Sequence, residues 1–306
     1  RPHGRIRNVG DLSPVEVVRT VRLGLAAACA AALGLVFGLP PGDVDAPPHG
    51  CISPPPTIPL AGDASGDQAP AKASSTEVFD DFDGPAGAPP DPAKWTVVEG
   101  AGWDRGDQTY ARENAVLDGQ GHLALRAERA DDGYVSGRVE TRRKAAFGYG
   151  TLIARIKMPD GKGLWPAFWL MGADEDKNPW PGAGEIDVVE VVSDPTRRYS
   201  SLHGPIPDVE DYLQAQVAGD SPDLSAEFHD YWLIHRPDRI IIGIDDVVWA
   251  DFTPQSLPPE ATWVYNKRFC LILNLAVGGD WAGSPDGTTE FPAAMLVDWV
   301  HWQPAD

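Results

Sequence analysis

The feature that most constrains the fold is a series of short runs, rich in β-branched and alternating apolar residues, that begins near residue 77. Such runs fit a pleated, half-buried surface, and Gly, Pro and Asp between them are typical of β-sandwiches and barrels. No long stretch holds a 3.6-residue hydrophobic period. We therefore predict one all-β domain over residues 77–306, whose sheets can curve and leave one concave face open to a long ligand. The runs are HLALRAE, GRVETRRK, GYGTLIARIKM, GEIDVVEVV, DYWLIHR, RIIIGIDDVVWADF, FCLILNLAV and MLVDWVHWQ.

The N-terminal part of the chain has a different character. Arginine-containing residues 1–22 precede an uncharged apolar run at residues 23–39, which together resemble the charged and hydrophobic regions of an export signal. A cleaved signal peptide and an uncleaved signal anchor both stay open, and either one would export the remainder. Residues 40–76 are rich in Pro, Gly, Ser and Ala and are predicted to form a disordered linker. We expect an extracellular protein, secreted or held at the outer face of the cytoplasmic membrane.

The net charge of −20 argues against nucleic acid and anionic membrane surfaces as partners, although solubility alone would also explain it. A membrane contact is expected only through the N-terminal segment. The three cysteines show no spacing typical of a zinc site. Cys270, in FCLILNLAV, is predicted to be a buried free thiol.

One predicted strand, GEIDVVEVV at residues 184–192, carries three carboxylates among Val and Ile. Side chains alternate faces along a strand, so Glu185 and Asp187 share one face. Glu190 is out of step with them. Either Glu190 points to the other face, or a β-bulge inserts one residue and returns Glu190 to the face of the first two.

Three carboxylates on one strand face allow three readings: an active site, a calcium cluster or an edge strand with surface charges. Neighbouring like charges raise one another's pKa. A retaining glycosidase uses this situation, with two carboxyl groups roughly 5–5.5 Å apart. One stays ionised as the nucleophile and the other stays protonated as the acid.

Aromatic residues near this strand favour the glycosidase reading, because aromatic rings stack on sugar faces. Trp165 and Trp169 lie upstream in GLWPAFWL, and Trp281 lies downstream in the Gly-rich stretch GGDWAG. The alternative for the first two is a place in the core. His203, in SSLHG, follows the acidic strand closely enough to approach the same cleft, or else is an ordinary structural histidine.

These motifs together resemble glycoside hydrolase family 16, in particular its bacterial laminarinase-like endo-β-1,3-glucanases. The resemblance covers residues 77–303 and rests on five motifs besides the stretch 136–172, which contains GLWPAFWLMG. They are DDFDG (80–84), WPGAGEIDVVEVV (180–192), LHG (202–204), EFHDYWLIHRPDRI (227–240) and the segment from FCLILNLAVGGDW to MLVDWV (269–300). This resemblance implies a concanavalin-like β-jelly-roll of two curved antiparallel sheets, a concave substrate cleft and retention of anomeric configuration.

The resemblance also implies roles for individual residues. Glu185 would be the nucleophile, Asp187 the assisting carboxylate and Glu190 the acid/base, and the family motif contains the β-bulge that brings Glu190 to their face. The remaining positions implied to bind substrate are Trp165, Trp169, His203, Trp281, Arg138 and Trp103.

Many family members hold a structural calcium on the convex side. The matching positions here are Asp81, the backbone carbonyl of Gly121, and Asp298, which turn or edge positions would equally explain. No cofactor is expected for catalysis. The stretch GWDRGDQTYAREN at residues 102–114 differs from the Asn/Glu-rich stretch of relatives, so only Trp103 is carried over from it.

We therefore expect a monomeric endo-β-1,3-glucanase acting on laminarin-type β-glucan. Rival activities within the family are β-1,3-1,4-glucanase, agarase-like galactan hydrolysis and transglycosylation. From other classes, the rivals are a lectin-like glycan-binding module and, more distantly, a calcium-binding wall protein. The presence of both glutamates argues against a module that only binds.

Overall fold

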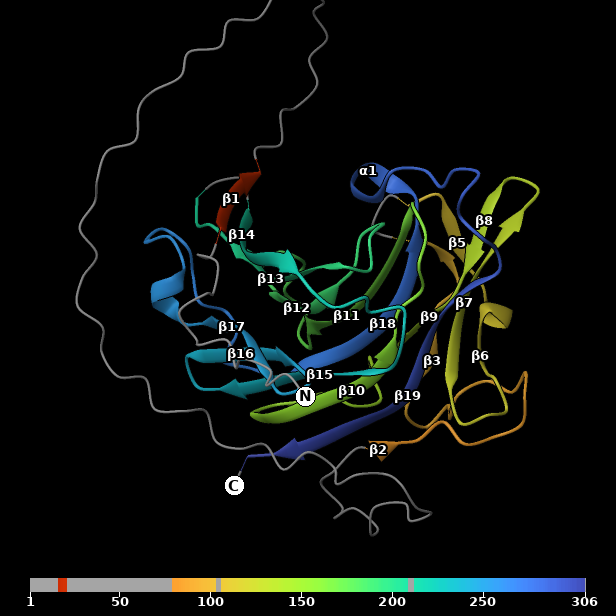
Figure 1. Ribbon diagram of the computed structural model, residues 1–306. Coiled ribbons are helices and arrows are strands. Elements are labelled where there is room, and N and C mark those ends of the chain that lie inside the picture. Colours follow the sequence, from red (N-terminus) through yellow and green to blue (C-terminus); the bar gives the residue numbers. More distant parts are fainter. Residues whose placement is uncertain (1–15, 21–78, 103–105, 209–211, 306) are drawn as a thin grey trace, which may run out of the picture. The chain divides into compact units, whose positions relative to one another are not determined.

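The computed structural model describes residues 16–20, 79–102, 106–208 and 212–305. Its strands form two sheets that stack face to face (Figure 1). All strand pairs are antiparallel except β5 with β8. The first sheet, in spatial order, contains β1 (Glu16–Thr20), β14 (Tyr212–Asp220), β13 (Arg197–Pro205), β12 (Glu185–Glu190), β11 (Leu164–Gly172), β18 (Phe269–Val277), β9 (Arg138–Glu140) and β3 (Thr96–Val97).

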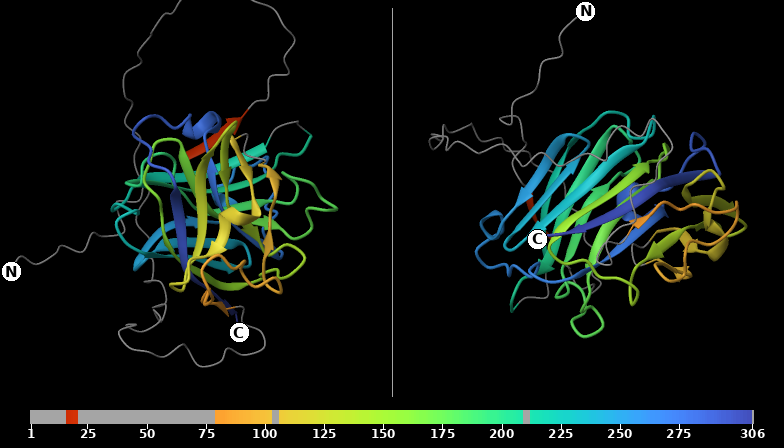
Figure 2. Two further views of the ribbon diagram at one scale, coloured as in Figure 1. Left: turned by 90° about the vertical axis from the view of Figure 1, so that its right-hand side faces the viewer. Right: turned by 90° about the horizontal axis from the view of Figure 1, so that it is seen from below.

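The second sheet covers the back of the first (Figure 2). In spatial order it contains β17 (Val247–Phe252), β16 (Arg239–Ile244), β15 (His229–Arg236), β10 (Gly150–Lys157), β19 (Ala293–Pro304), β7 (Leu123–Ala130), β8 (Gly133–Ser136), β5 (Gln108–Tyr110) and β4 (Gly100–Ala101). β2 (Phe79–Asp80) pairs with β19, and β6 (Ala115–Leu117) pairs with β7. The helical segments of the described residues are short: η2 (Arg112–Asn114), η3 (Pro254–Ser256) and α1 (Gly279–Ala282).

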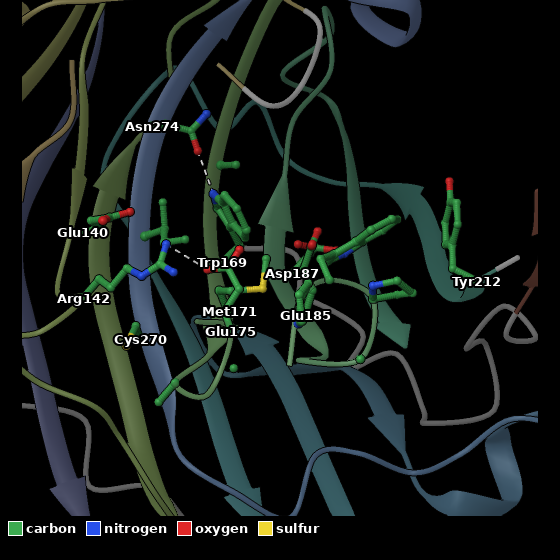
Figure 3. Close-up of a pocket in the computed structure, with 18 of the residues that line it drawn as sticks. Glu140, Arg142, Trp169, Met171, Glu175, Glu185, Asp187, Tyr212, Cys270 and Asn274 are labelled. Atoms are coloured by element: carbon green, nitrogen blue, oxygen red, sulfur yellow. Dashed lines mark hydrogen bonds and ion pairs between the residues drawn. The ribbon is translucent and has the colours of Figure 1, made fainter. Parts of the chain in front are cut away.

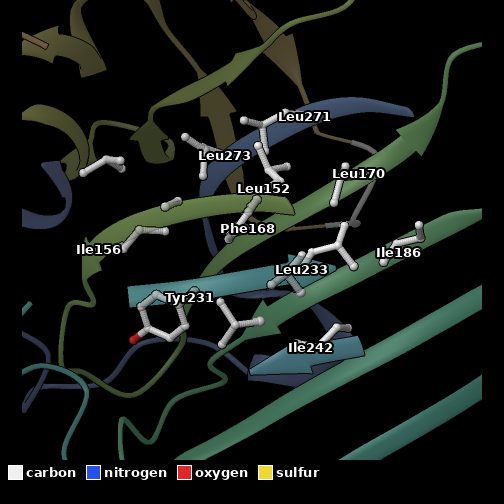
Figure 4. Packing of buried hydrophobic residues seen from close by; sticks show 14 of the residues in the cluster. Leu152, Ile156, Phe168, Leu170, Ile186, Tyr231, Leu233, Ile242, Leu271 and Leu273 are labelled. Carbon is white, nitrogen blue, oxygen red and sulfur yellow. The ribbon is translucent and has the colours of Figure 1, made fainter. Parts of the chain in front are cut away.

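The core lies between the two sheets, where side chains of alternate strand positions meet (Figure 4). β18 shows how this alternation prepares the site. Leu271, Leu273 and Leu275 point into the core, whereas Cys270, Ile272 and Asn274 face the opposite side, along the cleft. Every residue of β18 is buried, because its outward face forms the floor of that cleft. Cys270 is the buried free thiol that the sequence predicted.

The fold class is therefore the predicted two-sheet β-sandwich, and each run picked out in the sequence contains a strand. Four strands of the first sheet, β3, β11, β13 and β14, were not among those runs. β1 was also unexpected, because it falls in the segment predicted to be the charged start of an export signal; its residues EVVRT are rich in β-branched side chains, and it pairs with β14. The apolar run and the linker lie outside the described residues. No helix of the described residues is long and apolar enough to cross a membrane.

Candidate active site

A cleft of about 1260 Å³ runs over the exposed face of the first sheet (Figure 3). β11, β12 and β18 supply its centre with the side chains that do not point into the core. Along β11 these are Trp165, Ala167, Trp169 and Met171. The strand pattern that builds the core therefore also lines the cleft.

A β-bulge in β12 brings all three predicted carboxylates to the cleft. Asp187 pairs with Trp169 of β11, yet Val189 pairs with the preceding residue Phe168, which leaves Val188 as the extra residue. The same shift appears against β13, where Asp187 lies opposite Ser201 and Glu190 opposite Tyr199. Both valines are buried in the core. Of the two arrangements that the sequence left open, the structure has the bulged one.

His203 completes one end of this carboxylate row. It lies directly opposite Glu185 on the neighbouring strand β13. Its Nε2 is 3.1 Å from Oδ2 of Asp187 and 3.9 Å from Oε1 of Glu185. Asp187 is only 2% exposed, so the imidazole is a close polar neighbour of a deeply buried carboxyl. The structure thus brings His203 into the cleft, as the sequence suggested.

Trp165 completes the other end of the row. Its indole N–H donates a hydrogen bond of 2.9 Å to Oε1 of Glu190. The ring lines the cleft and does not enter the core, which answers the question that the sequence left open for this residue. Glu190 is itself buried and therefore held in one orientation by this contact.

The electrostatics of the row favour partial protonation. Burial, followed by the negative charge of Asp187, raises the pKa of Glu185 to about 8. Burial likewise raises the pKa of Asp187, and burial with the charge of Asp187 raises the pKa of Glu190 well above its ordinary value. Three buried carboxyls this close cannot all ionise together at neutral pH. A row of this kind can hold one carboxylate and one carboxylic acid side by side.

A hydrogen-bonded network supports Trp169 and Arg138 beside the row. The indole N–H of Trp169 donates to Oδ1 of Asn274 at 2.6 Å, and the amide of Asn274 contacts the hydroxyl of Tyr110 at 3.1 Å. The guanidinium of Arg138 lies over the ring of Trp169, 5.2 Å from its centroid. Asn274 was missed in the sequence, although a lone amide at the cleft-facing position of an apolar strand was its signal.

Trp281 is 41% exposed and lies beside Trp165, the residue that donates a hydrogen bond to Glu190. Its ring packs edge-to-face on Trp165, with centroids 5.1 Å apart, and against Tyr199 at 4.8 Å. A second aromatic group stands near His203, where the rings of Trp180 and Tyr212 are 4.8 Å apart. Tyr199, Trp180 and Tyr212 were not predicted. Trp281 is exposed and the other three rings are half-buried, so all four reach the surface, where a ring can stack on a sugar.

Charged side chains that the sequence reading did not single out line the cleft on the side of β9. Arg142 is paired with Glu175 at 2.9 Å and with Asp176 at 2.6 Å. Glu140 lies 3.5 Å from Arg138. Altogether the cleft is lined by Arg138 and Arg142 against six carboxyl side chains, those of Glu140, Glu175, Asp176, Glu185, Asp187 and Glu190. The walls therefore carry an excess of acidic groups.

Metal-ligating side chains come together at one place within the described ranges. Ligand atoms of Glu185, Asp187 and His203 lie within 4.8 Å of one another, but these groups already belong to the carboxylate row.

The predicted calcium positions converge elsewhere, around β19. Asp80, next to Asp81, pairs with Val300, and Leu123, two residues after Gly121, pairs with Val297 on the same strand, so both flank Asp298.

The charged groups around Asp298 form an ion-pair cluster. The guanidinium of Arg155 contacts Asp298 at 3.2 Å and Asp230 at 3.0 Å, so two carboxylates share one positive charge. Burial raises the pKa of Asp298, and Asp230 adds to this rise, although the charges of His122 and Arg155 lower it. Trp103 lies outside the described residues, so its predicted role stays a prediction.

Closely spaced carboxyl groups in an open cleft of a β-sandwich, with aromatic rings beside them, define the class of glycoside hydrolases. Comparison with known proteins agrees with this class. The model of glycosyl hydrolases family 16 matches residues 103–301, and the chain belongs to that family.

Two relatives and one solved structure support membership of this family. The chain is 35% identical to a β-glucanase of Rhodothermus marinus, over 69% of this chain and 79% of that protein. It is 30% identical to glucan endo-1,3-β-glucosidase A1 of Niallia circulans over 55% of this chain, but it spans only 26% of that longer protein. The solved structure of the laminarinase from Rhodothermus marinus superposes with a TM-score of 0.67 at 33% identity, covering 75% of this chain and 97% of that one.

Proposed function

We propose that this glycoside hydrolase cleaves internal β-1,3 linkages of laminarin-type β-glucan with retention of anomeric configuration. The observation that carries the proposal is the bulge in β12, which brings Glu190 to the face of Glu185 and Asp187 in an open cleft. An open cleft suits cleavage within a chain, because a polysaccharide can cross it from side to side. The laminarinase and β-glucanase relatives support the same substrate.

The reaction follows from the two ends of the carboxylate row. Glu185, as a carboxylate, attacks the anomeric carbon, while Glu190 gives its proton to the departing glycosidic oxygen. The carbon–oxygen bond to the leaving sugar breaks as the bond to Glu185 forms. Glu190 then takes a proton from water, whose oxygen displaces Glu185 from the sugar. Two displacements at one carbon restore its original configuration.

The neighbours of these glutamates set their protonation states. Asp187 lies between them and raises the pKa of both when it is ionised. A proton retained by the row is therefore available to Glu190 at neutral pH. The indole of Trp165 orients that acid by its hydrogen bond to Oε1. The opposite end of the row, beside His203, is left to the nucleophile.

The charge of the cleft supports a neutral glycan. Six carboxyl side chains against two arginines would repel sulfate or carboxylate groups on a substrate. This favours β-glucan over sulfated galactans. Mixed-linkage glucan and agarose are also neutral, so β-1,3-1,4-glucanase and agarase-like activities are separated from the proposal by assay, as is transglycosylation. We further propose a monomer that is secreted or held at the outer face of the cytoplasmic membrane by its N-terminal segment.

The deciding experiment measures new reducing ends released from laminarin, curdlan, mixed-linkage glucan, agarose and carrageenan by the full chain. Glu185→Gln serves as the catalytic variant, and the exposed Glu227→Gln serves as a matched control outside the cleft. We expect release from laminarin and curdlan that Glu185→Gln abolishes and Glu227→Gln retains. Binding of laminarin without any release from the panel would instead indicate a glycan-binding module.

A further inference from the structure

Ser193 follows the end of β12, at a point where three chain segments meet. Its hydroxyl accepts a hydrogen bond of 2.9 Å from the backbone N–H of Gly163, just before β11. The same hydroxyl donates a bond of 2.8 Å to the carbonyl of Ala282, in α1. Its own backbone N–H donates to the carbonyl of Leu164 at 2.9 Å. One small side chain therefore ties together the start of β11, the end of β12 and the α1 turn.

The backbone of Ser193 is in an unusual conformation. Its φ is +62°, in the left-handed region that glycine adopts without cost and that other residues rarely occupy. Such a residue persists only where the surrounding structure compensates for it, and these outliers cluster at functional sites. A glycine here would relieve the backbone but would supply neither of the two hydroxyl bonds. The hydroxyl is thus the feature that distinguishes serine at this position.

The segments that Ser193 joins carry Trp165, which lines the cleft, and Trp281, which packs against it. Gly163 is two residues before Trp165, and Ala282 is adjacent to Trp281. The rings of these tryptophans pack edge-to-face, with centroids 5.1 Å apart. Trp165 in turn holds Glu190 through its indole N–H. A continuous path therefore runs from the exposed ring of Trp281 to the carboxyl of Glu190, and Ser193 fixes the backbone on both sides of it.

We infer that Ser193 is a positioning residue for the acid/base: it keeps the Trp281 platform in register with Trp165, so that a sugar stacked on Trp281 meets a correctly oriented Glu190. This inference rests on the proposed glucanase function. It predicts a kinetic role for a residue that does not touch the reacting atoms. The hydrogen bond from Trp165 lowers the pKa of Glu190, so a loosened Trp165 should also let that pKa rise.

The test compares Ser193→Gly with Thr289→Val. The glycine variant removes the hydroxyl and relieves the strained φ, so a loss cannot be attributed to added backbone strain. Thr289 is a matched control, because its hydroxyl also ties the region before β11 to the segment after α1, by donating to the carbonyl of Lys162 at 2.6 Å. That bond bypasses the α1 turn, which carries Trp281. Both variants are measured on laminarin and on a β-glucan oligosaccharide with a dinitrophenyl leaving group.

For Ser193→Gly we expect kcat/KM on laminarin to fall roughly three- to tenfold, the effect of losing one or two hydrogen bonds. The fall should lie in kcat. It should largely disappear with the dinitrophenyl substrate, because that leaving group departs with little need for protonation by Glu190. The alkaline limb of the pH profile should move to higher pH. Thr289→Val should share none of these changes even if it lowers the melting temperature.

A second readout does not depend on activity. The ¹⁵N–¹H signal of the Trp165 indole, assigned with Trp165→Phe, should shift in Ser193→Gly and stay in place in Thr289→Val. Equal losses on both substrates with an unmoved indole signal would overturn the inference, as would full activity in Ser193→Gly. If the wild-type protein releases nothing from laminarin, the proposed function fails, and the indole signal alone decides whether Ser193 holds Trp165.

Discussion

Nε2 of His203 lies 3.1 Å from Oδ2 of Asp187, and His203 is itself the residue of β13 that lies directly opposite Glu185. The contact places a polar ring against the most buried member of the carboxylate row. Asp187 thereby stands between an imidazole and two glutamates. Its charge state acts on both glutamates, which makes it the natural residue with which to test the electrostatics of the row.

Asp187→Asn should move the acid limb of the pH profile to lower pH. The ionised Asp187 raises the pKa of Glu185, since it disfavours a second negative charge nearby. Removing that charge lowers the pKa of Glu185, so the nucleophile becomes ionised at a lower pH. The measurement is kcat/KM on laminarin across the acid and alkaline limbs. A limb that stays in place, or moves upward, would contradict this account of the row.

Glu185→Gln should reduce turnover by at least about 10³-fold, because an amide cannot form the glycosyl-enzyme. Laminarin binding should survive, since the aromatic residues of the cleft are unchanged. Initial rates and equilibrium binding are measured on the same preparation, with circular dichroism to confirm the fold. Activity within about tenfold of the wild type would remove Glu185 from the role of nucleophile.

The same substitution should stabilise the protein, and more so at high pH. The folded-state pKa of Glu185 is raised to about 8, so between its ordinary value and pH 8 the native state binds a proton that the unfolded state has lost. The free energy of unfolding of the wild type therefore falls as the pH rises through this range. The amide introduced by Glu185→Gln does not titrate, so the advantage of the variant should grow to roughly 2–4 kcal/mol near the raised pKa. Melting curves of both proteins at about pH 5 and about pH 8 test this; an advantage that is equal at both pH values would contradict it.

The sequence was sufficient for the parts of this fold that depend on period and turn chemistry. Alternation in GYGTLIARIKM gave β10, and the Glu-x-Asp-x-x-Glu spacing posed the right choice between two arrangements of β12. It could not decide that choice from residues alone, because a bulge depends on the register of two neighbouring strands. The family resemblance supplied the expectation, and the register of β11 and β13 shows it.

Other parts were hidden for identifiable reasons. β11 contains Pro166, a residue that argues against a central strand, yet β11 pairs with β12 on one side and with β18 on the other. Ser193 was not singled out in the sequence, because its two hydroxyl partners lie far away along the chain and serine is not a residue type that signals a positive φ. The charged pairs of Arg142 join the turn after β9 to the β11–β12 loop, and no local sequence pattern predicts a contact between segments so far apart in the chain.

Calcium at β19 stays a prediction, and the structure suggests how to test it. Asp298 and Asp230 share the single guanidinium of Arg155, and the pKa of Asp298 is raised, so an added cation would be favourable there. We expect millimolar Ca²⁺ to raise the melting temperature, and EDTA to lower it, in the wild type. Asp298→Asn should abolish both shifts. Mg²⁺ serves as the control ion, because it requires shorter ligand distances and a more regular coordination geometry than Ca²⁺. A melting temperature that ignores Ca²⁺ and EDTA would exclude a structural calcium.

Glu190→Gln should separate the two chemical steps by their need for a proton. With laminarin, the leaving sugar hydroxyl needs protonation, so we expect turnover to fall by about 10²–10⁴-fold. With a dinitrophenyl leaving group the first step proceeds without an acid, and the glycosyl-enzyme should form rapidly and then accumulate, because no base activates water. A burst of dinitrophenol followed by a slow steady rate is the expected trace, and azide, which needs no base, should speed that steady rate. Since Trp165 donates to Oε1 of Glu190, Trp165→Phe should show a weaker form of the same leaving-group dependence while keeping the acid itself. Equal losses on both substrates for Glu190→Gln, with no burst and no azide effect, would show that Glu190 is not the acid/base.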